Sequence, residues 1–521
     1  SSEPRRRYNG TDPDRDPLPY SPFTVAEYPR PADPRQRAVL VTPRGLELVE
    51  GGQLSRTVTL PPASRARPLR FEEIARAVGD PRWIVEISPG VFGLAAAFVQ
   101  APGTAVRFAA PGTTEIRLGT ETPNVFIGGY GPDTSARFEG VKVTSWDLSR
   151  RAPSTDIEAA RPFVLYEHGA RLDIVRSEMA YLGSDRVGAY GVSWRQGGAT
   201  GEVVDSVFHH CFFGVYTYEA ADIVFRHNVF RDNIYYGFDP HDHSTGLVAE
   251  DNEAYGNGSH GFIVSRYVTR SSLRRNRSHH NGGNGIVLDF ESNHNVVAAN
   301  TVEDNEGDGI VILGSSANVV EDNVVRRNRV GLRANKPGTA NVVRNNRFVG
   351  NRIGIEAYEG AADLTLSGNV VSASGRAGMI LDAPGSTVAG GRISGGTIGI
   401  ELRAATSVRD VAIRAAGDGV VVRAGAAATI TQVTVDAGRI GARVEPGGTL
   451  EVRRSTLDAD RPTKGDVIVG RATVLISAPP ERTLPWLALA GITAVVVAVA
   501  LECLAFTRER RVRRGRILGH P

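Results

Sequence analysis

The stretch Asn276-Arg-Ser-His-His-Asn281-Gly-Gly-Asn-Gly285-Ile-Val-Leu-Asp289 contains the features that decide the fold. Two asparagines and a glycine followed by an apolar residue recur along the chain every 20 to 24 residues. The glycines are Gly191, Gly214, Gly237, Gly261, Gly285, Gly309, Gly331, Gly354, Gly378, Gly399, Gly419 and Gly441. The asparagines form two series, Asn228, Asn252, Asn276, Asn300, Asn323, Asn346 and Asn369, and Asn233, Asn257, Asn281, Asn305, Asn328 and Asn351. A period this short predicts one coil of a solenoid and not a helical hairpin.

Short alternating segments lie between these ladder residues, such as Gly285-Ile-Val-Leu-Asp289, and they predict strands of about four residues. Stacked coils of such strands predict an all-β protein, a right-handed parallel β-helix that rises about 4.8 Å per coil. The ladder asparagines are then expected to hydrogen-bond from coil to coil, which is a structural role.

The N-terminal part of the chain predicts an arm and a cap. Residues 1–65 are rich in Pro and Arg and predict an extended arm with a short strand pair between Arg37 and Val49. The amphipathic segment Phe71-Glu-Glu-Ile-Ala-Arg-Ala-Val predicts a helix, which Asp80-Pro81 ends. We expect this helix to cap the N-terminal end of a solenoid domain that spans residues 66–478.

The C-terminal part predicts a membrane anchor. Residues 484–506 are apolar and long enough for a transmembrane helix, and residues 507–521 are strongly basic. Because basic flanks stay on the cytoplasmic side, this pattern predicts a single-pass protein with the β-helix extracytoplasmic and the C-terminus cytoplasmic. The alternative is an apolar helix packed on the end of the solenoid.

Composition limits the remaining classes of function. The net charge of +3 comes from many charges of both signs, so it does not indicate a nucleic-acid partner, and we expect none. The two cysteines, Cys211 and Cys503, lie far apart in the sequence and imply no disulfide framework. Nine of the eleven histidines fall between His209 and His294, which suits a metal site, a proton-transfer site or a surface for anions. No metal-ligand spacing accompanies them, so no metal site is predicted.

The repeat is interrupted by chemically active residues at Tyr236-Gly-Phe-Asp-Pro-His-Asp242. The residue after each ladder glycine is apolar and should point inward, so alternation turns Asp239 and His241 outward. Counting one repeat to either side places Tyr216 and Ile263 beside Asp239. The same count predicts an outward row of Arg195, Tyr218, His241, Ser265 and Asp289.

Five segments resemble a known family. They are Val192-Ser-Trp-Arg195, Gly201-Glu-Val-Val-Asp-Ser206, Tyr216-Thr-Tyr-Glu219, Tyr236-Gly-Phe-Asp-Pro-His-Asp242 and His260-Gly-Phe-Ile-Val-Ser-Arg266. Together they resemble the bacterial mannuronan C5-epimerases, particularly the calcium-independent periplasmic alginate epimerases, from Phe71 to about residue 360. The resemblance implies conversion of β-D-mannuronate to α-L-guluronate in an alginate-like polyuronate. It implies no cofactor, and an anionic polysaccharide as partner. It leaves open whether the anchor joins a polysaccharide synthase or export complex.

The residues suit that chemistry. Epimerisation at C5 needs a base, an acid on the opposite face, and a cation that offsets charge on the C6 carboxylate. His241 is the expected base, and the resemblance gives this role to the histidine of the motif. Arg266 matches the arginine that neutralises the carboxylate, provided that a corner after Ser265 swings it outward. Asp239 is expected to bind sugar hydroxyls or orient the site, the alternative being a solvated strand carboxylate.

The acid and the substrate contacts are less constrained by the sequence. Tyr236 matches a tyrosine of the family, Tyr218 is the neighbour of His241 in the predicted row, and a bound water is a third alternative for the acid. Core packing is the other reading of Tyr236. The expected substrate-binding residues are Arg195, Tyr216, Asp242, His243, His260 and Asp289. His243 departs from the arginine often found in the family at its position.

Two other functions remain open at this stage. A polyuronate lyase begins with the same proton abstraction but protonates the O4 leaving group. A membrane-tethered β-helix could also bind polysaccharide without turning it over, since the fold alone does not imply an enzyme.

Overall fold

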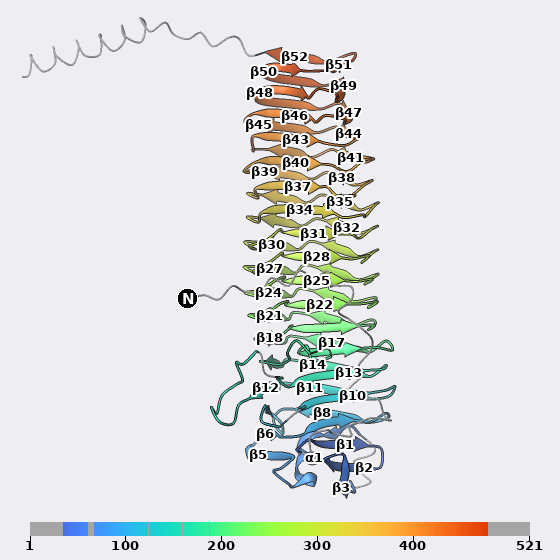
Figure 1. Ribbon diagram of the computed structural model, residues 1–521, viewed down its shortest axis with the longest axis vertical. Coiled ribbons are helices and arrows are strands. Elements are labelled where there is room, and N and C mark those ends of the chain that lie inside the picture. The colour runs from blue at the N-terminus through green and yellow to red at the C-terminus, as the bar shows by residue number, and fades with distance from the viewer. Residues whose placement is uncertain (1–34, 61–66, 123, 158–159, 187, 478–521) are drawn as a thin grey trace, which may run out of the picture.

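The computed structural model describes residues 35–60, 67–122, 124–157, 160–186 and 188–477 and shows a single column of stacked coils (Figure 1). A typical coil contains three short strands, and each strand pairs in parallel with the equivalent strands of the coils before and after it. For example, β22 (Phe238–His241) pairs with β19 (Val215–Tyr218) and with β25 (Phe262–Ser265). The predicted parallel β-helix is confirmed.

The strands form three parallel faces, which we call A, B and C in their order within a coil. Face A consists of β7 (Ala97–Gln100), β10 (Phe126–Tyr130), β13 (Phe163–Glu167), β16 (Val192–Arg195), β19, β22, β25, β28 (Ile286–Asp289), β31 (Ile310–Leu313), β34 (Val330–Asn335), β37 (Ile353–Ala357), β40 (Ala377–Leu381), β43 (Ile398–Leu402), β46 (Asp418–Val422) and the second half of β48 (Thr434–Val444). Face B consists of β4 (Leu69–Arg70), β8 (Ala105–Ala109), β11 (Ser135–Glu139), β14 (Arg171–Val175), β17 (Thr200–Val204), β20 (Val224–Arg226), β23 (Val248–Glu250), β26 (Ser272–Arg274), β29 (Val296–Ala298), β32 (Val319–Glu321), β35 (Val342–Arg344), β38 (Thr365–Ser367), β41 (Ser386–Ala389), β44 (Thr406–Arg409), β47 (Ala427–Thr431), β49 (Thr449–Arg453) and β51 (Val467–Val469). Face C consists of β6 (Val91–Leu94), β9 (Glu115–Gly119), β12 (Lys142–Trp146), β15 (Glu178–Ala180), β18 (Val207–His209), β21 (Val229–Arg231), β24 (Glu253–Tyr255), β27 (Arg277–His279), β30 (Thr301–Glu303), β33 (Val324–Arg326), β36 (Arg347–Val349), β39 (Val370–Ser372), β42 (Arg392–Ser394), β45 (Ala412–Ala415), the first half of β48, the first half of β50 (Thr456–Lys464) and β52 (Val474–Ser477). The second half of β50 pairs with the second half of β48 and continues face A.

The core runs along the axis of the column. The residue that follows each ladder glycine is buried there, as predicted, and Val215, Phe238 and Phe262 are at most 1% exposed. Both asparagine ladders are present at the corners. The side-chain oxygen of Asn252 accepts the backbone N–H of Asn228 at 2.9 Å, and its amide donates to the carbonyl oxygen of Phe225 at 3.0 Å. Each buried amide is thereby satisfied by neighbouring coils.

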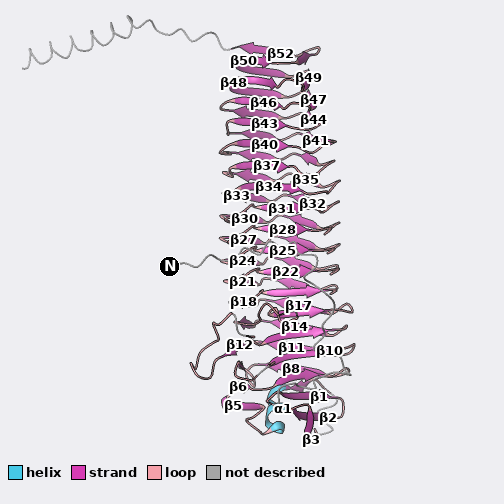
Figure 2. Ribbon diagram, viewed as in Figure 1, coloured by secondary structure: helices cyan, strands magenta, loops and turns pink. Residues whose placement is uncertain are grey.

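The predicted capping helix is α1 (Phe71–Val78), which lies at the N-terminal end of the column (Figure 2). Its apolar side is buried, and the ring of Phe71 contacts those of Phe92, Phe98 and Phe108 at centroid distances of 5.3, 5.5 and 5.0 Å. The helix ends at Gly79, whose φ of 56° closes the last turn in the left-handed region. An apolar helix side thus covers the end of the core.

The strand pair expected near Arg37 to Val49 is β1 (Arg37–Thr42) and β2 (Gly45–Glu50), which are antiparallel and are followed by β3 (Gln53–Val58). β1 also pairs in parallel with β7, and Val39, Val41, Leu46 and Leu48 are buried. This part of the predicted arm is therefore packed on the solenoid. β5 (Ile84–Ser88) forms a hairpin with β6 beside it.

The predicted transmembrane segment 484–506 and basic tail 507–521 lie outside the described residues. Between residues 35 and 477, in the parts that the structure describes, no helix is long and apolar enough to cross a bilayer.

Candidate active site

The predicted outward row is present on face A. Strand register pairs Arg195 with Tyr218, Tyr218 with His241, His241 with Ser265 and Ser265 with Asp289. Neighbours in this row are separated by one strand spacing, about 4.8 Å. The five side chains therefore lie along a line parallel to the axis of the column, one per coil.

A left-handed corner follows the row and explains the position of Arg266. β25 ends at Ser265, and Arg266 and Tyr267 have φ values of 60° and 64°. Asp242 and His243 take the same corner one coil earlier, with φ values of 28° and 56°, and the N–H of His243 donates to the carbonyl oxygen of Arg266 at 3.0 Å. Because the strand has ended, Arg266 no longer follows strict alternation. The corner places it beside Asp242.

Asp242 joins the base and the cation that the sequence predicts. One carboxylate oxygen is hydrogen-bonded to Nδ1 of His241, and the other lies 3.1 Å from Nε of Arg266. The Asp242 side chain is 7% exposed, and that of His241 is 19% exposed. A carboxylate at Nδ1 holds the proton of the neutral ring on Nδ1 and leaves Nε2 as an acceptor. Beyond the Asp242 contact, the Arg266 side chain has no acceptor among the described residues.

The surroundings make His241 more basic. Burial by itself would lower the pKa of His241, but the hydrogen bond with Asp242 and the negative charges of Asp239 and Asp242 outweigh it. The pKa therefore lies above its ordinary value of 6.5, although Arg266 opposes the rise. Asp239 itself is only 1% exposed, so it is not a solvated strand carboxylate.

An aromatic stack, formed by Tyr190, Phe213, Tyr236 and His260, lies next to the row. Successive ring centroids are 5.2, 5.2 and 5.3 Å apart. Tyr236 is 5% exposed and packs in this stack, separate from the main core. The sequence analysis missed Tyr190 and Phe213. Their signal was their position, since each directly precedes a ladder glycine.

His260 ends the stack as a neutral ring. Its Nδ1 accepts the backbone N–H of Asn284 at 3.0 Å, which leaves the proton on Nε2. Burial, together with the positive charge of Arg333, lowers the pKa of His260 to about 4. Tyr216 contacts both the stack and the base, with its ring 4.8 Å from that of Tyr190 and 5.6 Å from that of His241.

The row ends in a buried cation and a buried acid. Arg195 is 2% exposed and its guanidinium lies 5.3 Å from the centre of the Tyr218 ring, while Nε and Nη1 have no acceptor among the described residues. Asp289 accepts a hydrogen bond from Ser265 at 3.3 Å, and burial raises its pKa. His243 is exposed and stacks on Tyr267 at 4.7 Å, so it is not part of the contacts around His241.

The histidine-rich stretch is not one site. His209 and His210 contact each other on the side of face C, as do His279 and His280, through Nδ1 atoms 2.8 Å apart. Among the residues that the structure describes, no three His, Cys, Asp or Glu side chains are placed to hold a metal ion.

Comparisons with known proteins agree with this architecture. The family model described as "Right handed beta helix region" matches residues 184–325 and 242–371, which places this part of the chain in the right-handed class. The periplasmic alginate epimerase AlgG has a similar structure, with a TM-score of 0.50 and 23% identity over 79% of this chain and 83% of that one. This likeness concerns the fold.

Sequence similarity is higher over a shorter region. A mannuronan C5-epimerase of Pseudomonas syringae pv. tomato is 33% identical over 208 residues, which are 37% of this chain and 38% of that protein. The mannuronan C5-epimerase AlgG of Azotobacter vinelandii is 35% identical over 200 residues, 36% of this chain and 37% of the relative. The chain thus spans less than two fifths of the length of the curated relatives it matches. The expected resemblance to mannuronan C5-epimerases is confirmed.

Proposed function

We propose that this protein is an isomerase that epimerises uronate residues at C5 in an alginate-like polyuronate, converting β-D-mannuronate to α-L-guluronate. The observation that carries the proposal is Asp242, which holds His241 and Arg266 next to each other at the end of the face A row. The names of the similar proteins support the same reaction. Neither metal nor cofactor is part of the proposed step.

His241 is the proposed base. Its Nε2 takes the proton from C5, and the electron pair of that bond moves into the C5–C6 bond and onto the carboxylate. Arg266 offsets the added negative charge with the terminal nitrogens that Asp242 leaves free. The pKa of His241, raised above its ordinary value, favours acceptance of the proton.

Tyr218 is the proposed acid, which returns a proton to C5 from the opposite side of the sugar. It is half-buried and neighbours His241 in strand register. Tyr236 is more enclosed, because Phe213 and His260 stack against it, and we assign it the alternative acid role. Asp239 orients the site beside His241.

The proposed substrate contacts lie along the same face. Arg195, with two buried N–H groups that have no acceptor among the described residues, binds a carboxylate of a neighbouring sugar. Tyr216, His260, Asp242 and Asp289 complete the binding surface, and His243 contributes from its exposed corner. We also keep the proposal that residues 484–506 anchor the chain with the β-helix outside the cytoplasm.

Proton NMR of the full chain incubated with polymannuronate in deuterated water tests the reaction. Guluronate signals with deuterium at C5, and no unsaturated chain ends, are expected. Unsaturated 4-deoxy ends would identify a lyase instead. No change in polymannuronate or in other polyuronates would favour a protein that only binds polysaccharide.

A further inference from the structure

Three arginines lie in the corner that leads into face A, each just before a face A strand. Their coils are closer to the C-terminus than the proposed active site. Val330 pairs with Ile353, and Ile353 pairs with Ala377, so the residues before them, Arg329, Arg352 and Arg376, occupy one position in three successive coils. All three are exposed. We call them the arginine row. Its members are separated by about 4.8 Å along the column.

Two of the three arginines, Arg352 and Arg376, have no acidic partner among the described residues. Arg329 is neutralised by Asp308, which it meets at 2.9 Å and which also binds Arg333 at 2.6 Å. The side chains of Arg352 and Arg376 make no hydrogen bond or ion pair with the residues that the structure describes. The strands beside them carry an outward apolar cluster, separate from the core, of Val330, Ile353, Ala377, Ile380 and the partly buried Ile398. Apart from Ile398, the members of this cluster are at most 4% exposed, so it supports the strands and is not itself a contact surface. The exposed guanidinium groups of Arg352 and Arg376 suit an anionic polymer.

Between the arginine row and the proposed active site, the same corner carries only small side chains. Its equivalent positions in the intervening coils are Ser259, Gly283 and Gly307, since the N–H of Gly283 donates to the carbonyl of Ser259 and that of Gly307 to Gly283. A Cβ at Gly283 would lie 2.6 Å from Nδ1 of His260, and one at Gly307 would lie 2.5 Å from the Asn284 side-chain oxygen. Only glycine fits there, so no bulky side chain blocks this corner.

The spacing matches a sugar chain. From the coil of β22, register leads through β25, β28 and β31 to β34, which Arg329 precedes, and then to β37 and β40. The arginine row therefore lies about 19 to 29 Å along the column from His241. A 1→4-linked pyranose is about as long as one coil is thick. Arginines spaced by one coil can therefore meet carboxylates at intervals along one polyuronate strand.

We propose that Arg352 and Arg376, together with Arg329, form a distal binding track for a long polyuronate strand whose reacting sugar lies at His241. The identity of the polymer rests on the proposed function, whereas the track itself concerns binding. The track makes affinity depend on chain length, because a tetramer at His241 does not reach the arginine row. It also makes affinity depend on salt, because exposed guanidinium groups are screened.

The test compares two double variants of the full chain. Arg352→Gln with Arg376→Gln removes the two uncommitted charges of the track. Arg347→Gln with Arg392→Gln removes two exposed arginines at similar height on face C, which likewise make no side-chain ion pair with described residues. Binding of long, fluorescently labelled polymannuronate and of a mannuronate tetramer is measured by anisotropy at low salt and at 0.3 M NaCl. Melting temperatures verify that both variants fold.

The track variant should bind the long polymer about 2- to 20-fold more weakly than the unmodified protein, as two exposed ion pairs allow. Its tetramer affinity should be unchanged, the face C variant should bind normally, and the difference should shrink in 0.3 M NaCl. Equal weakening in both variants, or none in either, would overturn the track, and the second result would point to an acidic protein as the partner of the arginine row. An unmodified protein that binds no polyuronate would overturn it too.

Turnover separates this proposal from the proposed function. If both double variants epimerise the polymer and bind it with unchanged affinity, the proposed track is wrong and the proposed epimerase activity stands. If binding depends on polymer length but no epimerisation occurs, the proposed epimerase activity is wrong and the proposed track stands.

Discussion

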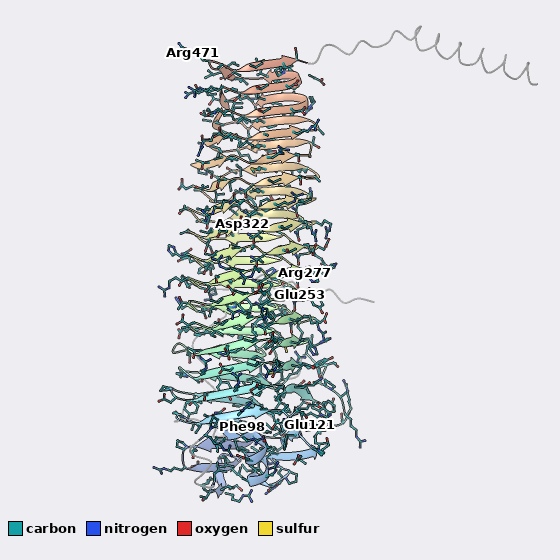
Figure 3. The ribbon with its side chains drawn as sticks, turned by 180° about the vertical axis from the view of Figure 1, so that it is seen from behind. Phe98, Glu121, Glu253, Arg277, Asp322 and Arg471 are labelled. Atoms are coloured by element: carbon teal, nitrogen blue, oxygen red, sulfur yellow. The ribbon has the colours of Figure 1, made fainter. Side chains whose placement is uncertain are left out.

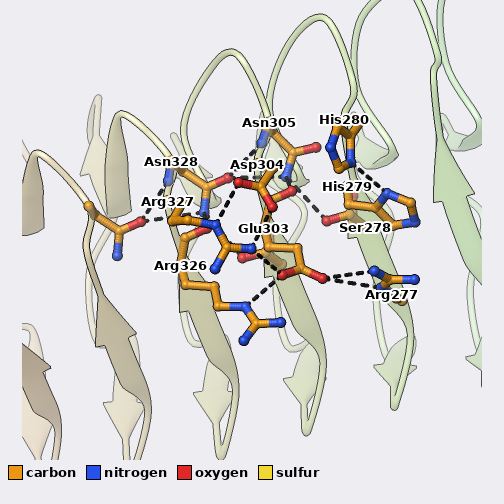
Figure 4. Close-up of polar contacts among 12 residues, drawn as sticks. Arg277, Ser278, His279, His280, Glu303, Asp304, Asn305, Arg326, Arg327 and Asn328 are labelled. Carbon is orange, nitrogen blue, oxygen red and sulfur yellow. Dashed lines mark hydrogen bonds and ion pairs between the residues drawn. The ribbon is translucent and has the colours of Figure 1, made fainter.

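The proposed active site at the end of the face A row and the ion-pair network around Glu303 on face C use their charges differently. On face C, Glu303 is 3% exposed and is surrounded by Arg277 at 3.0 Å, Arg326 at 2.6 Å and Arg327 at 2.7 Å (Figure 4). Arg277 also reaches Glu253, and these two side chains lie next to each other on the column surface (Figure 3). On face A, Asp242 shares its two oxygens between His241 and Arg266.

The difference lies in what remains unbound. The Glu303 carboxylate is enclosed by cations from adjacent coils, so this network ties coils together. At the proposed active site, Nε2 of His241 and the terminal nitrogens of Arg266 keep their capacity for a ligand. Two buried N–H groups of Arg195 also have no acceptor among the described residues. The same stacked geometry thus holds coils together around Glu303 and leaves groups available for a ligand around Asp242.

The largest effect that separates the two faces is expected at Arg266. Arg266→Met should lower kcat by about 10²- to 10³-fold, because it removes the cation that offsets charge on the carboxylate. Arg277→Met, the matched change on face C, should leave kcat within about twofold, since its exposed ion pairs contribute little. Steady-state rates on polymannuronate measure both. An Arg266→Met enzyme that keeps more than a tenth of its activity would place the cation elsewhere.

A smaller effect concerns pH. The neutral form of His241 is the base and its pKa is raised, so kcat/KM should fall on the acid side with an apparent pKa above 6.5. Asp242→Asn removes the charge and the hydrogen bond that raise this pKa, so the acid limb should move to lower pH. The plateau should also drop by at least about tenfold, because the tautomer is no longer fixed. A pH profile with an unmoved limb would show that another group titrates.

The smallest effect on activity is expected from Glu303→Gln on face C, which should cost stability only. Burial alone would raise the pKa of Glu303, but hydrogen bonds from Arg326 and Arg277 lower it to about 2. A lowered carboxyl pKa stabilises the folded state above the unfolded pKa of about 4.3, and that contribution is lost as pH falls towards 2.

The melting temperature of Glu303→Gln should therefore be lower than that of the unmodified protein at pH 7, corresponding to roughly 1–2 kcal/mol, since the arginines are half-exposed. The gap should close as pH falls from 4 to 2. Epimerase activity should stay constant. Equal melting curves at pH 7 would show that the face C network does not tie the coils together.

Much of this arrangement was predictable because a solenoid repeat sets strand register directly. Counting from the ladder glycines placed Tyr218 and Ser265 beside His241. Strand alternation predicted that Phe238 points into the core and Asp239 points outward. A third, shorter ladder of Asn295, Asn318 and Asn341 was not predicted, because three members do not stand out from other asparagines.

Other parts of the site depend on backbone that no period describes. The left-handed corner at Asp242 and Arg266 brings residues of adjacent coils together, so Asp242 contacts the base and the cation. The sequence had suggested Asp242 only as a substrate contact. Likewise, Tyr190 and Phe213 belong to a stack at a corner, where strand alternation no longer indicates which way a side chain points.

The most direct test of the central claim is deuterium at C5 of the polymer after incubation in deuterated water with His241→Ala, and with His279→Ala as the face C control. The account predicts that His241→Ala loses at least about 100-fold in the rate of deuterium incorporation, whereas His279→Ala matches the unmodified protein. Deuterium incorporation by His241→Ala at the unmodified rate would contradict the assignment of the base and, with it, the functional distinction between the two faces.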